Sequence, residues 1–381
     1  MMDRIMKVLP QDVAIYIFLM LPVKSLLRFK CTCKTFYNII NSSTFIHLHL
    51  NCSNDELILF KRSIKQEEED DLYKNILSFL SSEENGFDFK AISPDFDVPE
   101  VSTTSACVFV QVIGPCNGLI AITDSFATIL FNPTTRNYRS IPACPFGIPK
   151  RYRRSISGIG FGYDSIQNDY KFIRISEVYE DYMDKDMKVD IFDLSTDCWR
   201  ELNGQQVPLV FWTSCSEILY NNAFHWFAST DDTIVLCFEM STETFYHLEL
   251  PESCHWFDGK SDGLIIVNNS LSYIRYPDPL SDRPAEVLID IWIMKEYNKR
   301  ESWIKRCSIG PITIDTPLAV WKGDLLLLQT KNGDVIGYDL NSHEIRDLNL
   351  HGYPRSWRVV IYKESLTPIP REGDTILVKK F

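Results

Sequence analysis

The segment FDLSTDCW at residues 192–199 recurs in altered form at three other places in the chain. The copies are FNPTTRNY at 131–138, FEMSTETF at 238–245 and YDLNSHEI at 338–345. Each begins with an aromatic residue, continues with an acidic or amide residue, places Ser, Thr or Asn two positions later, and ends on a bulky residue. Because Asp, Asn and Ser side chains bond to the nearby backbone in turns, the pattern predicts four β-hairpins.

A fifth, looser copy runs from Trp292 to Trp303, and an apolar strand precedes each copy, at 118–123, 170–175, 223–228, 263–267 and 324–329. The first aromatic residues are spaced 61, 46, 54 and 46 positions apart. Several strands in each long unit are typical of propeller blades rather than of a sandwich or a helical solenoid. We expect structural positions at the repeat aromatics: Phe131, Phe192, Trp199, Phe238, Trp292, Trp303 and Tyr338.

The number of blades is less tightly fixed by the sequence. Segments 55–62 and 76–80, with the late strand 358–363, would supply a sixth unit or close the ring, so we expect about five to seven blades. An open stack of sheets is the alternative. Closure is favoured because it removes exposed sheet edges, and the acidic run 67–71 is then expected to be a solvated loop tip.

Composition excludes several classes of protein. The chain has 381 residues, a formal charge of −12, 45% hydrophobic and 13% aromatic residues. It is too apolar for a disordered chain and too acidic to bind nucleic acid with its whole surface. The eleven cysteines contain no CxxC pair and no signal peptide is evident, so we expect a cytoplasmic protein with free thiols. The longest apolar run, 13–21, is too short to cross a membrane, and no membrane contact is expected.

The charge is divided between two parts of the chain. Residues 1–50 hold six basic and two acidic residues, a charge of +4. Since the whole chain has a charge of −12, the remaining 331 residues carry −16. We therefore predict a basic domain at 4–50 and an acidic domain at 51–381. Two surfaces of opposite sign suggest two partners.

The first domain is predicted to be helical. Val13, Ile17 and Leu21 recur at helical spacing, and Pro22 ends one helix and can begin the next. Three short helices in about forty residues cannot bury so much apolar surface alone. Either another chain covers part of it, or the helices pack wholly on the second domain. The fold class expected is α+β by segregation, with three helices before a mainly-β, kelch-like propeller.

Motifs that would carry catalysis are weak. The segment 254–261 ends like a phosphate loop but lacks the first glycine, and the glycines at 158, 160 and 162 lack GxGxxG spacing and indicate a strand or bulge. His47 and His49 with Cys52 could imitate a metal site on a strand, yet no fourth ligand is evident. No HExxH or GxSxG occurs, so we expect no catalytic residue, metal or cofactor.

Lys150, Arg151, Arg153 and Arg154 form a basic cluster within the acidic domain. It could be a ligand-facing loop, an RNA-binding patch, a nuclear signal or an ordinary solvated loop between blades. Without aromatic residues interleaved on a sheet face, nucleic-acid binding is not expected. A nuclear pool stays open as an alternative for the localisation.

Residues 9–50, LPQDVAIYIFLMLPVKSLLRFKCTCKTFYNIINSSTFIHLHL, resemble the F-box over their whole length. The resemblance implies docking on the Skp-type adaptor of an SCF ubiquitin ligase and, through it, on a cullin. The residues that it implies at or around this contact are Leu9, Pro10, Leu21, Pro22, Val23, Leu26, Leu27 and Phe29. Phe36 stands where most F-boxes have Trp, and Tyr16 stands where many have an acidic residue. We therefore expect the docking on the adaptor to be weakened but not lost.

The second domain resembles the F-box-associated domain of plant F-box proteins. The similar blocks include GPCNGLIAITD at 114–124, GFGYDSIQNDYKF at 160–172 and VIYKESLTPIP at 360–370. With the F-box, they look most like the S-locus F-box proteins of S-ribonuclease-based self-incompatibility. That branch implies a non-catalytic receptor in the pollen-tube cytosol, which recruits non-self S-ribonucleases for ubiquitination.

Two other functions stay open: a plant F-box receptor for an unrelated protein, and a propeller that binds or converts a small ligand. An acidic surface would attract a basic ribonuclease, but selectivity among ribonucleases needs loop shape and local charge clashes. By loop position alone, the segments expected to contact a target are 88–104, 143–156, 178–188, 203–216 and 253–262.

Overall fold

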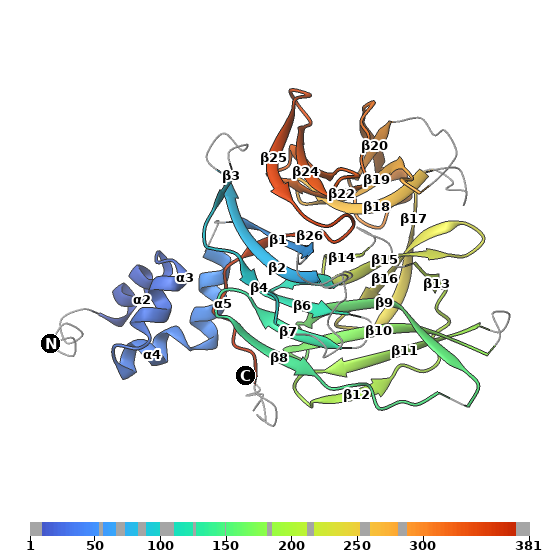
Figure 1. Ribbon diagram of the computed structural model, residues 1–381. Coiled ribbons are helices and arrows are strands. Elements are labelled where there is room, and N and C mark those ends of the chain that lie inside the picture. The colour runs from blue at the N-terminus through green and yellow to red at the C-terminus, as the bar shows by residue number, and fades with distance from the viewer. Residues whose placement is uncertain are drawn as a thin grey trace.

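The computed structural model describes residues 10–52, 56–65, 73–82, 89–99, 110–124, 127–148, 150–180, 185–211, 217–251, 260–280 and 288–370, and shows a helical head beside a large β domain (Figure 1). Leu9, the acidic run 67–71 and most of 254–261 lie outside these residues. The head holds the helices α2 (Gln11–Leu19), α3 (Val23–Phe29), α4 (Lys34–Ile40) and α5 (Ser43–Cys52).

The prediction of three helices was wrong, because α5 is a fourth. The alternating sequence HLHL at 47–50 looked like a strand, but the buried side chains of this segment are Phe45 and His49, four residues apart. The Nε2 atom of His49 lies 2.9 Å from the carbonyl oxygen of Leu21, which ties α5 to the end of α2. Tertiary packing thus overrides the alternating pattern.

The β domain consists of six antiparallel sheets, four with four strands and two with five in the described chain. Counted from β5, the first three blades consist of β5 (Gln111–Cys116), β6 (Leu119–Thr123), β7 (Thr128–Asn132), β8 (Asn137–Ile141); β9 (Arg153–Asp164), β10 (Asp169–Tyr179), β11 (Lys185–Asp193), β12 (Cys198–Glu201); β13 (Leu209–Val210), β14 (Glu217–Tyr220), β15 (Ala223–Ser229), β16 (Thr233–Glu239), β17 (Thr244–Glu249).

The other three sheets complete the ring. Their elements are β18 (Lys260–Val267), β19 (Ser270–Pro277), β20 (Ile289–Met294), the short helix η1 (Arg300–Ser302), β21 (Trp303–Ile309); β22 (Thr316–Trp321), β23 (Leu325–Gln329), β24 (Asp334–Asp339), β25 (Ile345–His351); β26 (Arg358–Lys363), β1 (Glu56–Lys65), β2 (Tyr73–Ser82), β3 (Phe89–Ala91), β4 (Phe96–Asp97).

The last sheet joins the two ends of the β domain. β26 pairs with β1 in antiparallel register, with Leu59 opposite Val360, and β1 continues into β2. The six sheets fall within the predicted five to seven blades, and the late strand closes the ring with the early ones. By pairing with β1, β26 covers an edge of that strand that would otherwise be unpaired.

The four repeated segments form the hairpins β7–β8, β11–β12, β16–β17 and β24–β25. In the first, the Asn132 Oδ1 atom accepts a hydrogen bond of 2.9 Å from the Thr134 backbone N–H, as an Asx turn requires. Trp303 is buried, and so are the four aromatic residues that begin the repeated segments: Phe131, Phe192, Phe238 and Tyr338. Trp199 and Trp292 are half-buried.

Three glycines on β9 lie against the neighbouring blade. A Cβ atom at Gly160 would come within 2.7 Å of Ile173 and 2.8 Å of Trp226, so a side chain there has no room. The register between β9 and β10 also shifts at Ile175 and Ser176. The prediction that these glycines lie on a strand is confirmed, and the backbone of that strand closely approaches the side chains packed against it.

A group of ion pairs joins the second and third blades. Lys171 on β10 is fully buried and its ammonium contacts the buried Asp164 carboxylate, with Glu243 of the next blade at 2.6 Å. Arg200 also pairs with Glu243, through a 2.8 Å hydrogen bond. Burial alone would raise the pKa of the Asp164 and Glu243 carboxyls, but the hydrogen bonds from Lys171 and Arg200 outweigh it and lower both pKa values.

This group predicts a loss of stability in acid. A carboxyl whose pKa is lower in the folded than in the unfolded state stabilises the fold above its unfolded pKa of about 4, and this contribution falls as the pH drops further. We expect the Tm to fall between about pH 5 and pH 3, and to fall less in Asp164→Asn. Calorimetric scans of both proteins measure this, and equal slopes would contradict it.

Candidate functional site

Helix α2 is apolar on two sides. Ala14 and Phe18 face the core of the head, with exposed fractions of 2% and 5%. On a neighbouring face Val13 and Ile17 are exposed, and so is the C-cap residue Met20, by 73%. The apolar residues Val13 and Ile17, which recur at helical spacing in the sequence, thus lie on the exposed face of α2.

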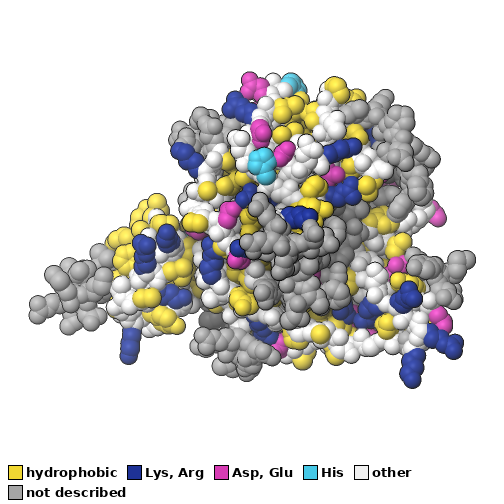
Figure 2. Space-filling view, viewed as in Figure 1, with side chains coloured by type: hydrophobic (Ala, Val, Ile, Leu, Met, Phe, Trp, Pro, Cys, Tyr) yellow, Lys and Arg dark blue, Asp and Glu magenta, His cyan; other side chains and the backbone are white. Residues whose placement is uncertain are grey.

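The exposed apolar side chains of the head lie close to basic ones. On the visible side of the head in Figure 2, hydrophobic and Lys or Arg side chains predominate. We call the following exposed apolar residues of the head the docking stripe: Val13, Tyr16 and Ile17 on α2, Met20 at its C-cap, Tyr37 on α4 and Leu48 on α5. Exposed basic residues of the head are Lys24 and Arg28 on α3 and Lys34 on α4. An uncovered apolar surface of this kind marks an interaction site.

The described residues that the F-box resemblance singled out fall into three groups by exposure. Val23 and Leu26 are buried in the head core, so they shape the surface from beneath. Leu21, Leu27 and Phe29 are half-buried, and Pro10 and Pro22 are exposed at the starts of α2 and α3. The sequence missed Met20 and Leu48, since a helix that is apolar all round does not show which face is covered.

Phe36, which replaces the usual Trp, is a core residue of the head. It is 9% exposed, and its ring packs edge-on against Phe18, with centroids 4.9 Å apart. Its backbone N–H donates to the Sγ atom of Cys33, the N-cap of α4. Its main role in this chain is therefore internal packing, whereas Tyr16 is 67% exposed on the docking stripe.

The head core receives one residue from the far end of the chain. Leu366 is 6% exposed and packs in the same cluster as Phe18, Leu26 and Ile40. In Figure 1 the C-terminal segment passes beside α5. This segment follows β26, so it connects the head to the closing blade.

Residues around Leu366 are held on the first blade. The Asn132 Nδ2 atom donates to the carbonyl oxygens of Ser365 and Thr367, at 3.1 and 2.9 Å. Gly118, with a φ of +74°, leaves the space that Ser365 fills, because a Cβ atom there would lie 2.1 Å from it. The C-terminal segment is therefore fixed on the propeller while Leu366 inserts into the head.

The propeller has two different faces. The hairpin turns near Asn117 and Asn132 lie on the face that the C-terminal segment crosses. Since neighbouring strands are antiparallel, the loops between blades emerge on the opposite face. The predicted target loops 143–156, 178–188, 203–216 and 253–262 join strand ends on that opposite face, which we call the loop face. Parts of them lie outside the described residues.

Two of the predicted loops, 88–104 and 203–216, were partly wrong. The described residues of 88–104 include the short strands β3 and β4, which pair with β2, and 203–216 contains β13, which pairs with β15. Tertiary pairing makes strands of segments too short to show a pattern.

The basic cluster is split by the fold. Arg153 begins β9 and is exposed, as are Lys150 and Arg151. Arg154 instead turns inward, where its Nη1 atom donates to the Phe146 carbonyl at 3.1 Å and lies 3.9 Å from Asp190. Only three of the four charges are therefore available on the loop face.

The alternative that His47, His49 and Cys52 form a metal site on a strand is not supported, because these residues lie on helix α5. On α5, His47 is exposed and His49 is buried, because residues two apart point to different sides of a helix. Among the described residues, no group of three or more His, Cys, Asp or Glu side chains could hold a metal ion. None of the helices in the described part of the chain has the length and hydrophobicity that a membrane span needs.

Comparison with known proteins identifies both domains. The family profile described as "F-box domain" matches residues 7–48, and the one described as "F-box associated beta propeller domain" matches residues 75–366. Of solved structures, an oligogalacturonate lyase in complex with manganese is similar in fold, with a TM-score of 0.41 and 8% identity over 77% of this chain and 84% of that one.

Relatives from Arabidopsis thaliana match nearly the whole chain. F-box protein CPR1 is 25% identical over 95% of this chain and 89% of its own length. The F-box/kelch-repeat protein At3g23880 is 23% identical over 85% of this chain and 86% of its own. With the propeller profile covering well over half of its residues, the chain belongs to the family of F-box proteins that carry an F-box associated β-propeller domain.

Proposed function

We propose that this protein is the substrate-recognition subunit of an SCF-type ubiquitin ligase. The observation that carries the proposal is the docking stripe, which stays uncovered although the other apolar residues of the head form a buried cluster that Leu366 joins. A Skp-type adaptor is the partner that an F-box binds, and a cullin joins through the adaptor.

Such a subunit acts by proximity and needs no nucleophile of its own. The loop face lies opposite the turns on which the head is seated, so a bound target and the adaptor do not compete for one surface. The long loops between blades offer the shape variation that recognition of particular proteins requires. This arrangement supports a receptor rather than an enzyme.

For the target, we propose a basic secreted ribonuclease of the S-ribonuclease type, from non-self haplotypes. Support comes from the S-locus resemblance of the blocks at 114–124, 160–172 and 360–370, and from the −16 charge of residues 51–381. Opposite charge raises the association rate but draws every basic ribonuclease alike. Discrimination is assigned to the loop face, including Lys150, Arg151 and Arg153, whose charge would repel a basic target locally.

A second candidate is a receptor of the same kind for an unrelated protein. It is favoured by the relatives in Arabidopsis thaliana, which are named F-box proteins without reference to an S-locus. Both candidates place the protein in the cytoplasm, beside the adaptor and the cullin.

A binding panel distinguishes the two candidates. The full chain, in complex with the adaptor, is titrated with purified S-ribonucleases of known haplotypes at low and raised salt. We expect binding of non-self ribonucleases with at least tenfold preference over self, and weaker binding of all of them at high salt. Binding of the adaptor without any ribonuclease would overturn the ribonuclease proposal and leave the receptor proposal intact.

A further inference from the structure

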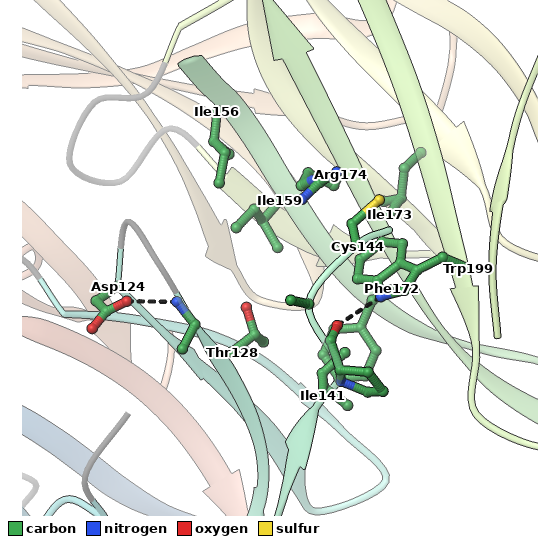
Figure 3. Close-up of a pocket in the computed structure, with 13 residues that line it drawn as sticks. Asp124, Thr128, Ile141, Cys144, Ile156, Ile159, Phe172, Ile173, Arg174 and Trp199 are labelled. Carbon is green, nitrogen blue, oxygen red and sulfur yellow. Dashed lines mark hydrogen bonds between the residues drawn. The ribbon is translucent and has the colours of Figure 1, made fainter. Parts of the chain in front are cut away.

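A cavity of about 220 Å³ lies between the first two blades, on the loop face of the propeller (Figure 3). One wall comes from the sheet β5–β8 and the loops at its ends, and the other from β9, β10 and β12. Its lining residues are Asp124, Ala127, Thr128, Ile141, Pro142, Ala143, Cys144, Ile156, Ile159, Phe172, Ile173, Arg174 and Trp199.

The larger part of the lining is apolar. Ile141, Ile159 and Phe172 are buried by 93% or more, and Ile156 is half-buried beside them. For comparison, an apolar protein cavity of about 150 Å³ accommodates benzene. This cavity is therefore large enough for one ring with a small polar substituent.

One end of the cavity is basic. The Nη2 atom of Arg174 donates to the Asp190 Oδ2 atom at 2.6 Å, and the guanidinium lies 5.1 Å from the ring centroid of Trp199. Arg154 approaches the same carboxylate at 3.9 Å. Two guanidinium groups thus face one carboxylate.

The polar atoms at this end are not all paired. Asp190 is fully buried, and its Oδ1 atom has no hydrogen-bond partner among the described residues; the same holds for the Nε atom of Arg154. At the Arg174 end of the cavity two guanidinium groups share one carboxylate, and this local excess of positive charge favours an anionic group of a ligand beside Arg174; the second carboxylate of the lining, Asp124, lies at the other end. Asp124 lies across the cavity from Trp199 and Cys144 (Figure 3). Its Oδ1 atom accepts a hydrogen bond of 2.8 Å from the Ala127 backbone N–H.

The loop that covers the cavity is held at two points. The Trp199 Nε1 atom donates to the Pro142 carbonyl at 2.7 Å, and Arg154 donates to the Phe146 carbonyl at 3.1 Å. Ala143 and Cys144 between these points line the cavity. A wall fixed before binding lowers the entropy cost of binding.

From these contacts we propose that the cavity binds a small organic acid with a single ring, whose carboxylate meets Arg174 and whose ring lies among Ile141, Ile156 and Ile159. The proposal is independent of the receptor function. A ligand here would occupy the edge of loop 143–156 and so become part of the surface that a protein target meets.

The test uses benzoate and its uncharged counterpart benzamide on the full chain, by isothermal titration calorimetry. Benzoate is expected to bind at least tenfold more tightly than benzamide. It should also slow the alkylation of Cys144, followed by mass spectrometry of that peptide, because the thiol lines the cavity. Equal binding of the two compounds would show a plain apolar pocket, suited to a side chain of a protein target, and would overturn the proposal.

Two variants of the lining, with one control and one substitute, locate the binding. Ala143→Trp fills the cavity from an exposed loop position and should weaken benzoate binding at least tenfold, whereas Ser140→Trp, on an exposed position of β8 outside the lining, should not. Arg174→Lys keeps a cation beside the buried Asp190 and should reduce the preference for benzoate at least threefold. Ile156→Phe serves if Ala143→Trp does not fold. Benzoate binding unaffected by the filling variant, or no binding to the native chain, would overturn the proposal.

Discussion

Replacing both Ile17 and Met20 by aspartate should lower the affinity for the Skp-type adaptor at least about 100-fold, because central apolar contacts of an interface each cost about 2 kcal/mol or more when lost. Both side chains are exposed, by 45% and 73%, so the fold of the head should not change. Calorimetric titration with the purified adaptor measures the affinity, and a thermal scan of the free protein checks the fold.

A matched control separates the docking stripe from general surface effects. Ile345 on β25 is 52% exposed and belongs to the propeller, so Ile345→Asp should leave adaptor binding unchanged. Leu26→Asp is a poor test of docking because Leu26 is fully buried and its replacement would disrupt the head core. Normal adaptor binding by the Ile17/Met20 double variant would contradict the assignment of the docking stripe.

Leu366→Ala is expected to destabilise the head by about 2–5 kcal/mol, as is usual when a buried leucine is truncated. Leu366 lies near the C-terminal end of the chain, yet it packs among Phe18, Val23 and Phe45 of the head. Hydrogen exchange should become faster in α2–α5 while the propeller strands keep their protection. The same variant should bind the adaptor more weakly, in proportion to the loss of folded head.

The same C-terminal segment provides the control. Ile369 packs against the cluster of the first blades rather than against the head. Ile369→Ala should therefore speed exchange in the strands beside it and leave α2–α5 unchanged. If both variants affected only the propeller, Leu366 would not connect the head to the body.

Local features of the sequence predicted the hairpins, because an Asx turn such as that at Asn132 depends on residues two or three positions apart. The sixth blade could be predicted in outline, since closure needs a strand from each end. The side of α2 that stays exposed could not be predicted, because Val13, Ile17 and Phe18 are all apolar and spacing alone does not show which face is covered.

Contacts between distant segments account for the rest. The head–body connection depends on Leu366, which carries no local signal, and the inward turn of Arg154 depends on Asp190, 36 positions away. Helix α5 was missed because its alternating histidines and leucines matched a strand pattern, while the bond from His49 to the Leu21 carbonyl was invisible in sequence. Each of these is a tertiary contact that overrides a local preference.

The most direct measurement is reconstitution of the full chain with the Skp-type adaptor and the cullin, followed by sizing with multi-angle light scattering. The expected result is a single complex that contains one copy of each protein, and its loss in the Ile17→Asp/Met20→Asp double variant but not in Ile345→Asp. A native chain that stays separate from the adaptor at micromolar concentration would contradict the assignment of this protein as an SCF substrate receptor.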